Sequence, residues 1–331
     1  YATRGYILPM DEYFTAEEKA QFIDSAVQAG SWQGTFYAPP MNTSTQVLWY
    51  NKALLAEAGV EIPENSTEHR LTWEQVADLA RATLDVVDPN RNKGIFGLDW
   101  QQISRTYQMN ALPNSMGGAN IGEDGFTVEG VINSEPWIKA MTWYQGLVQE
   151  GLSSQGIAAD EMGNYFSSGK LVFMAGGTWT AGSCEAAGMM DYGYCAMPAF
   201  EGYDDQVGTP TGSWHFGINA ASKNKEAAAD FIKFMTLGEG NDMWLDINGD
   251  VPSLKRSLDA IVADESAKGF LRIGAFEAAN TSVPRALTPG YSEYSTIIDA
   301  TWEDVRNGAD VTEALNAAVA QINTALEKYK Q

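Results

Sequence analysis

The stretch that decides the fold reads Val47–Leu48–Trp49–Tyr50–Asn51–Lys52–Ala53–Leu54–Leu55, then Gly59, then Leu71–Thr72–Trp73–Glu74. The apolar run from Gln46 to Tyr50 predicts a short buried strand. The segment Lys52–Ala58 predicts a helix, which Gly59 ends because glycine readily takes the left-handed conformation after a last helical turn. Thr72 can cap the next helix, and Glu74 suits its positive end. The stretch therefore predicts a strand followed by two helices.

Strand and helix patterns continue along the whole chain. Strand-like apolar runs cover residues 95–100 and 171–175. Helical periodicity covers residues 16–29, 137–150, 227–236 and 311–329. Strands that alternate with helices indicate an α/β class with largely parallel sheets. The 331 residues, of which 44% are hydrophobic, can bury more than one core. The length thus predicts two lobes of roughly 150 residues each.

The charge balance excludes several classes of partner. Lysine and arginine total 21 against 43 aspartates and glutamates, so the net charge of −22 opposes nucleic acid and anionic lipid. We interpret this charge as a solvated acidic surface. No apolar run approaches the roughly 18 residues that cross a bilayer, and the start at Tyr1 lacks a basic segment followed by an apolar one. We therefore expect a mature, soluble chain whose export signal has been removed.

The only two cysteines, Cys184 and Cys195, lie eleven positions apart. This spacing allows a small closed loop, and export would favour oxidation, so we expect a disulfide between them. A pair of buried free thiols is the alternative. Neither a CxxC spacing nor clustered histidines accompany the pair, which argues against a metal or redox site.

Four more sequence blocks follow the first in a set order: Met174–Trp179, Gly193–Pro198, Gly217–Lys225 and Pro284–Tyr291. Together with residues 47–74, they resemble the family 1 extracellular solute-binding proteins of bacterial ABC sugar importers, which are maltose-binding-protein-like. The resemblance covers essentially the whole chain. Family members usually carry about 70 further residues before the segment that Tyr1 begins, so we expect that part of the family's first lobe is missing here.

The resemblance implies an α/β, two-lobed periplasmic-binding-protein fold of a type II-like kind, with a hinge of crossover strands and a ligand cleft between the lobes. It implies crossovers near residues 37–45, 214–221 and 283–288. It assigns residues 1–42 and 220–284 to the amino-terminal lobe, and residues 43–219 and 285–331 to the carboxy-terminal lobe.

The resemblance also implies a function, namely ligand capture, hinge closure in the manner of a Venus flytrap, and delivery to the membrane permease of an ABC transporter. It implies a monomer without a cofactor, located in the periplasm or held outside the cell by a lipid anchor. The 10 tryptophans favour a neutral mono- or oligosaccharide as ligand, with a polyol or an anionic sugar as the alternative. A glycoside hydrolase is the rival class, but no sequence feature raises one carboxylate pair above the rest.

Sugars present flat C–H faces beside dense hydroxyls, so a sugar cleft needs aromatic platforms and a few fixed polar groups. The resemblance places a stacking platform at Trp179, and a position in the core is the alternative. Gly177, with Thr178 next to it, would let backbone amides approach the ligand closely. Trp214 and Ser213 lie at the second crossover, where Trp214 either lines the cleft or packs in the hinge.

Arg285 lies at the third crossover, where its five-donor fork could hold sugar hydroxyls or an acidic group. An ion pair between the lobes is the alternative. His215 has no partner for catalysis or metal binding, so we assign it a hydrogen-bonding or core role. The other candidates carry aromatic, amide or hydroxyl groups at strand ends or crossovers: Asn42, Thr43, Ser44, Trp100, Gln101, Gln102, Tyr291 and Tyr294. We expect no catalytic and no metal-binding residue.

Overall fold

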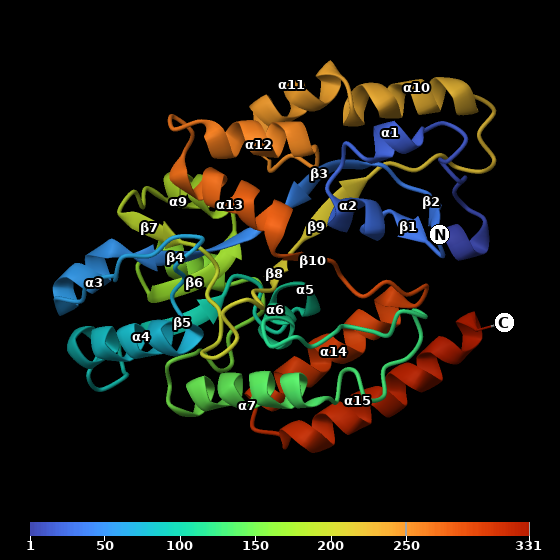
Figure 1. Ribbon diagram of the computed structural model, residues 1–331. Helices are drawn as coiled ribbons and strands as arrows, with labels where there is room; N and C mark the ends of the chain where they lie inside the picture. Colours follow the sequence, from blue (N-terminus) through green and yellow to red (C-terminus); the bar gives the residue numbers. More distant parts are fainter. Residues whose placement is uncertain (249, 331) are drawn as a thin grey trace.

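The computed structural model describes residues 1–248 and 250–330 and has two lobes (Figure 1). The larger lobe contains β4 (Gln46–Asn51), α3 (Lys52–Ala58), α4 (Trp73–Val87), β5 (Phe96–Trp100), α5 (Thr106–Met109), α6 (Ala111–Asn114), α7 (Glu135–Gln149), α8 (Met162–Ser167), β6 (Leu171–Gly177), α9 (Thr180–Ala187), β7 (Tyr192–Cys195), α14 (Tyr291–Arg306), α15 (Val311–Leu326) and the 3-10 helix Glu327–Tyr329. The smaller lobe contains the 3-10 helix Ala2–Arg4, α1 (Ala16–Lys19), α2 (Asp24–Ala29), β1 (Ser31–Trp32), β2 (Thr35–Phe36), α10 (Lys225–Thr236), α11 (Glu239–Asn248) and α12 (Lys255–Ala263). A further helix, α13 (Gly269–Asn280), packs against both lobes.

A four-stranded sheet in the order β5-β6-β4-β7 forms the centre of the larger lobe. β5 and β6 are parallel, with Trp100 opposite Ala175. β4 runs antiparallel to both β6 and β7, so the prediction of largely parallel sheets is wrong for this lobe. The reason is that β4 follows the crossover strand β3 (Pro40–Ser44) with only Thr45 between them, instead of following a helix that returns over the sheet.

Local signals set the first elements of this lobe. α3 covers Lys52–Ala58 as predicted, with the Asn51 side chain accepting from the Leu54 amide and Gly59 ending the helix at φ 66°. α4 begins after a capping box in which Thr72 and Gln75 bond each other's backbone amides. The largest buried side chains of the lobe are aromatic, and they pack beneath α4, α7 and α14 in one continuous core: Trp49, Trp73, Trp100, Trp137, Trp302, Tyr144 and Tyr294.

The smaller lobe buries two compact clusters of its own. One gathers around Met10, Phe14 and Phe22, and the other around Ile23 and Val251. The single helix predicted for residues 16–29 is instead two short helices, α1 and α2. The helix breaks because Phe22 pairs with Leu254 and the Ile23 amide donates to the Ser253 carbonyl, which are partners more than 200 positions away.

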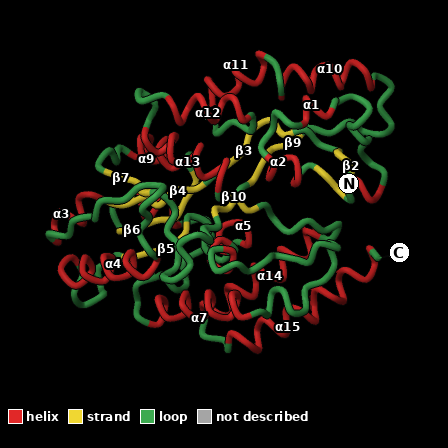
Figure 2. Tube along the Cα trace, in the orientation of Figure 1, coloured by secondary structure: helices red, strands yellow, loops and turns green. Residues whose placement is uncertain are grey.

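Short strands connect the lobes at three places along the chain: at β3, at β8 (Thr209–Pro210) with β9 (Gly212–His215), and at β10 (Ser282–Val283). β3 pairs antiparallel with β9, and β8 pairs parallel with β10. Figure 2 shows these strands running through the middle of the molecule between the helices of the two lobes. β9 overlaps the predicted second crossover at residues 214–215, and β8 lies just before that range.

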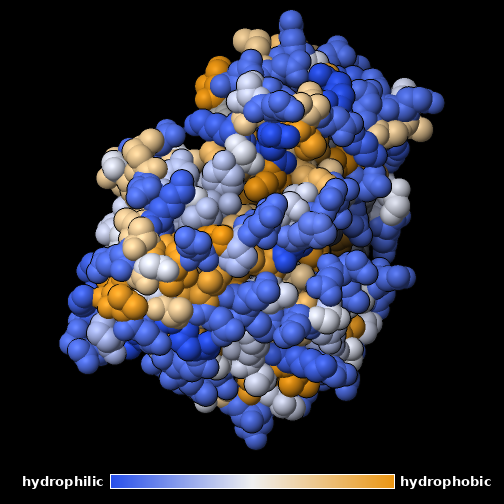
Figure 3. Space-filling view, turned by 60° about the vertical axis from the view of Figure 1, so that its left-hand side comes forward, coloured by the Kyte–Doolittle hydropathy of each residue, from blue (hydrophilic) through white to orange (hydrophobic). Residues whose placement is uncertain are grey.

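Two buried side chains also lie across the predicted lobe boundaries, because Ile218 packs in the smaller lobe and Phe270 in the core of the larger one. Hydrophilic residues dominate the face that Figure 3 shows, with smaller hydrophobic areas among them. No helix in the described part of the chain combines the length and apolarity needed to span a bilayer.

Candidate functional site

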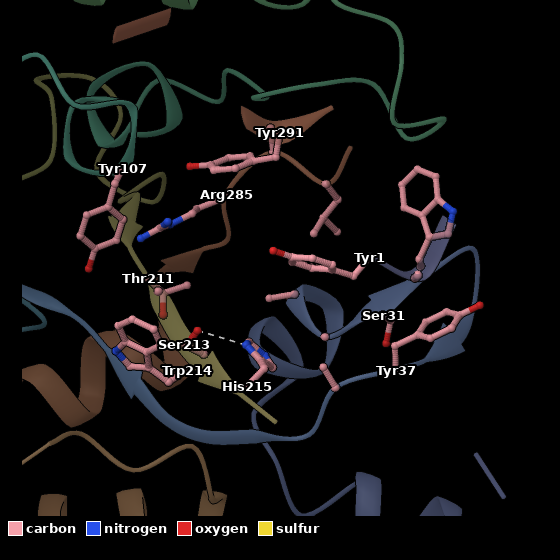
Figure 4. Close-up of a pocket in the computed structure, with 18 of the residues that line it drawn as sticks. Tyr1, Ser31, Tyr37, Tyr107, Thr211, Ser213, Trp214, His215, Arg285 and Tyr291 are labelled. Carbon is pink, nitrogen blue, oxygen red and sulfur yellow. Dashed lines mark hydrogen bonds between the residues drawn. The ribbon is translucent and has the colours of Figure 1, made fainter. Parts of the chain in front are cut away.

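A cavity of about 700 Å³ lies where the crossover strands meet both lobes. Its walls come from residues 1–7, the end of α2, β1, β3, β9 and the segment that leads into α14. It includes eight residues that the sequence predicted for the site: Asn42, Ser44, Gln102, Trp179, Ser213, Trp214, Arg285 and Tyr291. Figure 4 shows several of these side chains directed toward one shared space.

Trp179 reaches the cavity because of the glycine two positions before it. The indole ring lies directly over Gly177, where an added Cβ would come within 2.0 Å of a ring carbon. The ring remains 41% exposed, although it follows the buried strand β6. Trp179 also stands at the start of α9, so helix and glycine together present its ring to the cavity.

Trp214 lies on β9 and is 75% exposed. Its backbone amide donates to the Asn42 Oδ1 at 3.2 Å, which ties β9 to β3. The Asn42 Nδ2 in turn donates to the Asp250 Oδ2 at 2.7 Å, and the Trp244 Nε1 donates to the same oxygen at 2.9 Å. These successive hydrogen bonds hold in place the strand β9, which carries the exposed indole of Trp214.

Hydroxyl groups link the two crossover strands at the cavity wall. The Ser44 Oγ donates to the Gly212 carbonyl at 2.7 Å and lies 2.7 Å from the Tyr107 hydroxyl. The Thr211 Oγ1 donates to the Ser44 carbonyl at 2.9 Å and lies 2.7 Å from the Thr43 Oγ1. Thr43 is buried beneath this wall and does not line the cavity, contrary to the prediction.

Arg285 lies between two tyrosine rings, as Figure 4 shows. Its guanidinium carbon is 4.5 Å from the centre of the Tyr107 ring and 5.9 Å from that of Tyr291. Burial raises the pKa of both tyrosines, so both keep their phenolic hydrogens at neutral pH. Arg285 itself is exposed to the cavity.

His215 takes the hydrogen-bonding role that the sequence suggested. Its Nδ1 lies 3.1 Å from the Ser213 carbonyl and its Nε2 lies 3.1 Å from the Ala26 carbonyl. Burial lowers its pKa, while the two carbonyls oppose that shift. Burial favours the neutral imidazole, which has a single N–H, so the ring donates to one of the two carbonyls while its other nitrogen only contacts the second, and it lies between β9 and α2.

Several residues predicted for the site lie elsewhere. Trp100 is fully buried, with its ring centre 5.3 Å from that of Trp73, because α4 covers the sheet there. Tyr294 is fully buried, and its hydroxyl donates to the Asn120 carbonyl at 2.6 Å. Both assignments to the ligand cleft are wrong in this structure.

The segment next to Trp179 is also inward-facing. The Gln101 Oε1 accepts from the Gly177 amide at 3.0 Å, so neither group is available to a ligand. Thr178 is buried against Gly274. Gly177 thus makes room for the indole of Trp179, and the predicted close approach of its amide to a ligand does not occur.

The two cysteines form no disulfide, so that prediction is wrong and the alternative of buried free thiols holds. Cys184 lies on α9, and Cys195 lies opposite Leu48 in the sheet. Burial raises the pKa of Cys184 to about 11 and that of Cys195 to about 12. Each thiol therefore remains protonated and packs as a small apolar group.

Other lining residues were not found from the sequence: Tyr1, Ser31, Trp32, Tyr37, Tyr107, Thr211 and Asp250. Tyr107 lies on α5, a helix of four residues, and Asp250 follows α11. Neither stands in a distinctive motif, and only the folded chain brings them to the crossovers. Among the described residues, no group of three or more histidine, cysteine or acidic side chains has the arrangement of a metal site.

Two lobes that are joined by crossover strands and share a cavity define a ligand-binding protein of the periplasmic-binding class. The chain belongs to the bacterial extracellular solute-binding protein family, whose profile matches residues 1–269.

Several curated proteins and solved structures are similar to this chain over most of its length. A putative binding protein of Brucella abortus is 24% identical over 99% of this chain and 77% of its own length. A galactooligosaccharide-binding protein of Bacillus subtilis is 25% identical over 90% of this chain and 68% of its own length. A solved cyclo/maltodextrin-binding protein in complex with maltotetraose superposes with a TM-score of 0.80 at 23% identity, covering 100% of this chain and 80% of the other.

Proposed function

We propose that this protein is the carbohydrate-capturing subunit of an ABC importer. It binds a mono- or oligosaccharide between its lobes and delivers it to a membrane permease. It acts as a monomer without catalysis, outside the cytoplasm, either in the periplasm or on a lipid anchor. The names of the relatives support a carbohydrate ligand, since they include a galactooligosaccharide-binding protein and a complex with maltotetraose.

One observation carries this proposal, namely the exposed indoles of Trp179 and Trp214 in a shared cavity that also holds fixed polar groups. Aromatic faces stack on the C–H faces of sugar rings. Gln102 supplies an amide group of the kind that pairs with sugar hydroxyls.

The cavity argues against hydrolysis. A glycoside hydrolase needs two carboxyl groups that flank the scissile bond. Among the described lining residues, Asp250 is the only acidic side chain, and its Oδ2 already accepts hydrogen bonds from Asn42 and Trp244. Binding without chemistry is therefore the better account.

The proposed mechanism is hinge closure. We assign residues 1–42 and 220–284 mainly to one lobe and residues 43–219 and 285–331 to the other, with the strands β3, β8, β9 and β10 between them. A ligand that touches both sides of the cavity stabilises the closed arrangement, because only closure completes its contacts. The closed form is then the form that the permease receives.

A thermal-shift screen of neutral sugars, polyols and sugar acids tests the proposal. A ligand at a hundred times its dissociation constant adds roughly 2.7 kcal/mol of stability, which raises the melting temperature measurably. Small-angle scattering with that ligand should give a smaller radius of gyration. A protein that none of the carbohydrates stabilises, but that an amino acid or peptide does, would falsify the proposed ligand class.

A further inference from the structure

Arg285 differs from most arginines of this chain in having no acidic partner among the residues that the structure describes. Six others form ion pairs with aspartate or glutamate: Arg70, Arg81, Arg91, Arg105, Arg256 and Arg306. The chain carries 43 acidic residues against 21 lysines and arginines, so acidic partners are abundant. Among the described residues, none has a carboxylate within 4.0 Å of the Arg285 nitrogens. Its positive charge thus faces the cavity uncompensated.

The two flanking rings hold the guanidinium in a defined position. Tyr107 lies 4.5 Å from the guanidinium carbon and Tyr291 lies 5.9 Å from it, measured to the ring centres. The Tyr107 hydroxyl is itself fixed by Ser44 at 2.7 Å. Rings beside a guanidinium stack against it and leave the N–H groups along its edge free to donate. Because the rings already hold the guanidinium of Arg285 in place, its side chain loses less conformational entropy when a ligand binds.

A second positive feature lies beside Arg285. The helix α14 begins at Tyr291, which lines the cavity, and no side chain of the described residues caps its amino end. The carboxylate of Glu293, in its first turn, bonds Lys328, Tyr329 and its own backbone amide. An uncapped helix start carries partial positive charge and unpaired amides.

We propose that Arg285 selects a carbohydrate ligand that bears an acidic group, either a carboxylate or a phosphate. This inference rests on the proposed carbohydrate-binding function and names its ligand class. The guanidinium fork matches the two oxygens of a carboxylate or phosphate, and such charge-assisted pairs are stronger than bonds to neutral hydroxyls. Trp179 and Trp214 would contact the sugar rings, while Arg285 receives the acidic group.

The competing role for Arg285 is an ion pair with Asp250 when the lobes close. Asp250 is the only acidic lining residue among those described, and its Oδ2 accepts hydrogen bonds from Asn42 and Trp244. An ion pair of that kind would stabilise closure around any ligand, neutral or acidic. The two roles therefore predict different dependence on the charge of the ligand.

Calorimetric titration with matched probes separates them. The pairs are galacturonic acid with galactose, digalacturonic acid with galactobiose, and glucose 6-phosphate with glucose, and maltotriose is a further neutral probe. The variants are Arg285→Gln, Arg285→Lys and Asp250→Asn. Arg272→Gln serves as a matched control, because the Nε of Arg272 donates to the Val262 carbonyl and Arg272 does not line the cavity. Circular dichroism confirms that each variant is folded.

We expect the parent to bind one acidic probe about 10- to 100-fold more tightly than its neutral counterpart, the range for a charge-assisted hydrogen-bonded pair. Arg285→Gln should abolish that preference, Arg285→Lys should keep part of it, and Arg272→Gln should keep all of it. The galacturonic acid probes and glucose 6-phosphate together show whether the site prefers a carboxylate or a phosphate.

Three results would overturn the inference while leaving the proposed function in place. They are tighter binding of a neutral probe by the parent, binding of maltotriose but of none of the acidic probes, and an equal loss for both members of a pair in Arg285→Gln. If Asp250→Asn also weakens the binding of both members of a pair equally, Arg285 forms the ion pair with Asp250 between the lobes. A protein that binds no carbohydrate at all would remove the proposed function together with the inference.

Discussion

Trp100 ends one strand of the sheet and Trp179 closely follows the neighbouring strand, yet Trp100 lies in the core and Trp179 lies in the cavity. Trp100 ends β5 opposite Ala175 of β6, and Trp179 comes only four residues after Ala175. Trp100 is fully buried and Trp179 is 41% exposed. The sequence offers the same residue type in both places, so residue type alone does not identify a binding platform.

The surroundings of each ring account for the difference. Aromatic rings of α4 and α7 enclose Trp100, with Trp73 at 5.3 Å and Tyr144 at 5.6 Å between ring centres. Trp179 lies against the backbone of Gly177 and has no comparable cover. A covered ring contributes to folding, and an uncovered ring in a cavity remains available for a ligand.

The largest expected effect comes from Trp100→Ala. Removing a fully buried tryptophan leaves a cavity and should lower the free energy of unfolding by about 3–5 kcal/mol. Urea denaturation followed by circular dichroism measures this change. Val86→Ala is the control, because Val86 lies on the exposed face of α4 and should change stability by less than about 0.5 kcal/mol. A folded Trp100→Ala protein with parent stability but weakened ligand binding would reverse the comparison.

Trp179→Ala should act on binding instead of folding. Losing a stacking ring should weaken the affinity for the carbohydrate found by screening by roughly 2–4 kcal/mol, in the range of a hot-spot residue. Titration calorimetry measures this loss. Trp137→Ala is the matched control, because Trp137 is fully buried on α7 and should affect folding only. Affinity within about threefold of the parent, under ~1 kcal/mol, would remove Trp179 as the platform.

Elements with local signals could be predicted from the sequence, and elements with distant partners could not. α3 begins beside Asn51 and ends at Gly59, so both of its ends are encoded within nine residues. The helix predicted for residues 16–29 fails at Phe22 and Ile23, whose partners Leu254 and Ser253 are distant in sequence. Strand direction in the sheet likewise depends on pairing that periodicity does not specify.

The site residues also divide into those that the sequence could identify and those that only the folded chain brings together. Trp179 and Arg285 stand in sequence blocks whose order carries the family resemblance, Trp214 stands at the predicted second crossover, and all three line the cavity. Tyr107 and Asp250 come from segments without such a motif. Trp100 was misplaced because the end of a strand can face either the core or a cleft, and only the packing of α4 and α7 decides which.

Gly177→Ala tests the physical cause of the comparison directly. An added Cβ would lie within 2.2 Å of three ring atoms of Trp179, so the indole must move from its present position. We expect a loss of about 1–3 kcal/mol in ligand affinity, the usual cost of overpacking, together with a shifted tryptophan fluorescence spectrum. Gly182→Ala on α9 is the control, because no atom lies within 4 Å of its added Cβ.

The outcome of Gly177→Ala depends on whether Trp179 is a platform. If the glycine only relieves crowding inside the lobe, stability falls and affinity in the folded fraction is unchanged. If it positions the platform, affinity falls and adding Trp179→Ala to Gly177→Ala causes little further loss. The double variant therefore measures the coupling between the two residues.

The smallest expected effect is that of Trp214→Ala, which compares the two exposed indoles. Trp214 is 75% exposed against 41% for Trp179, so less of its ring is held in place before a ligand arrives. Ordering the ring on binding offsets part of the stacking energy, and we expect a loss of about 1 kcal/mol, roughly fivefold in affinity. The substitution keeps the backbone amide that donates to Asn42, so β9 should retain its pairing with β3. Calorimetry on both single variants with one ligand gives the ranking, and a larger loss for Trp214→Ala than for Trp179→Ala would place the main platform on the crossover strand.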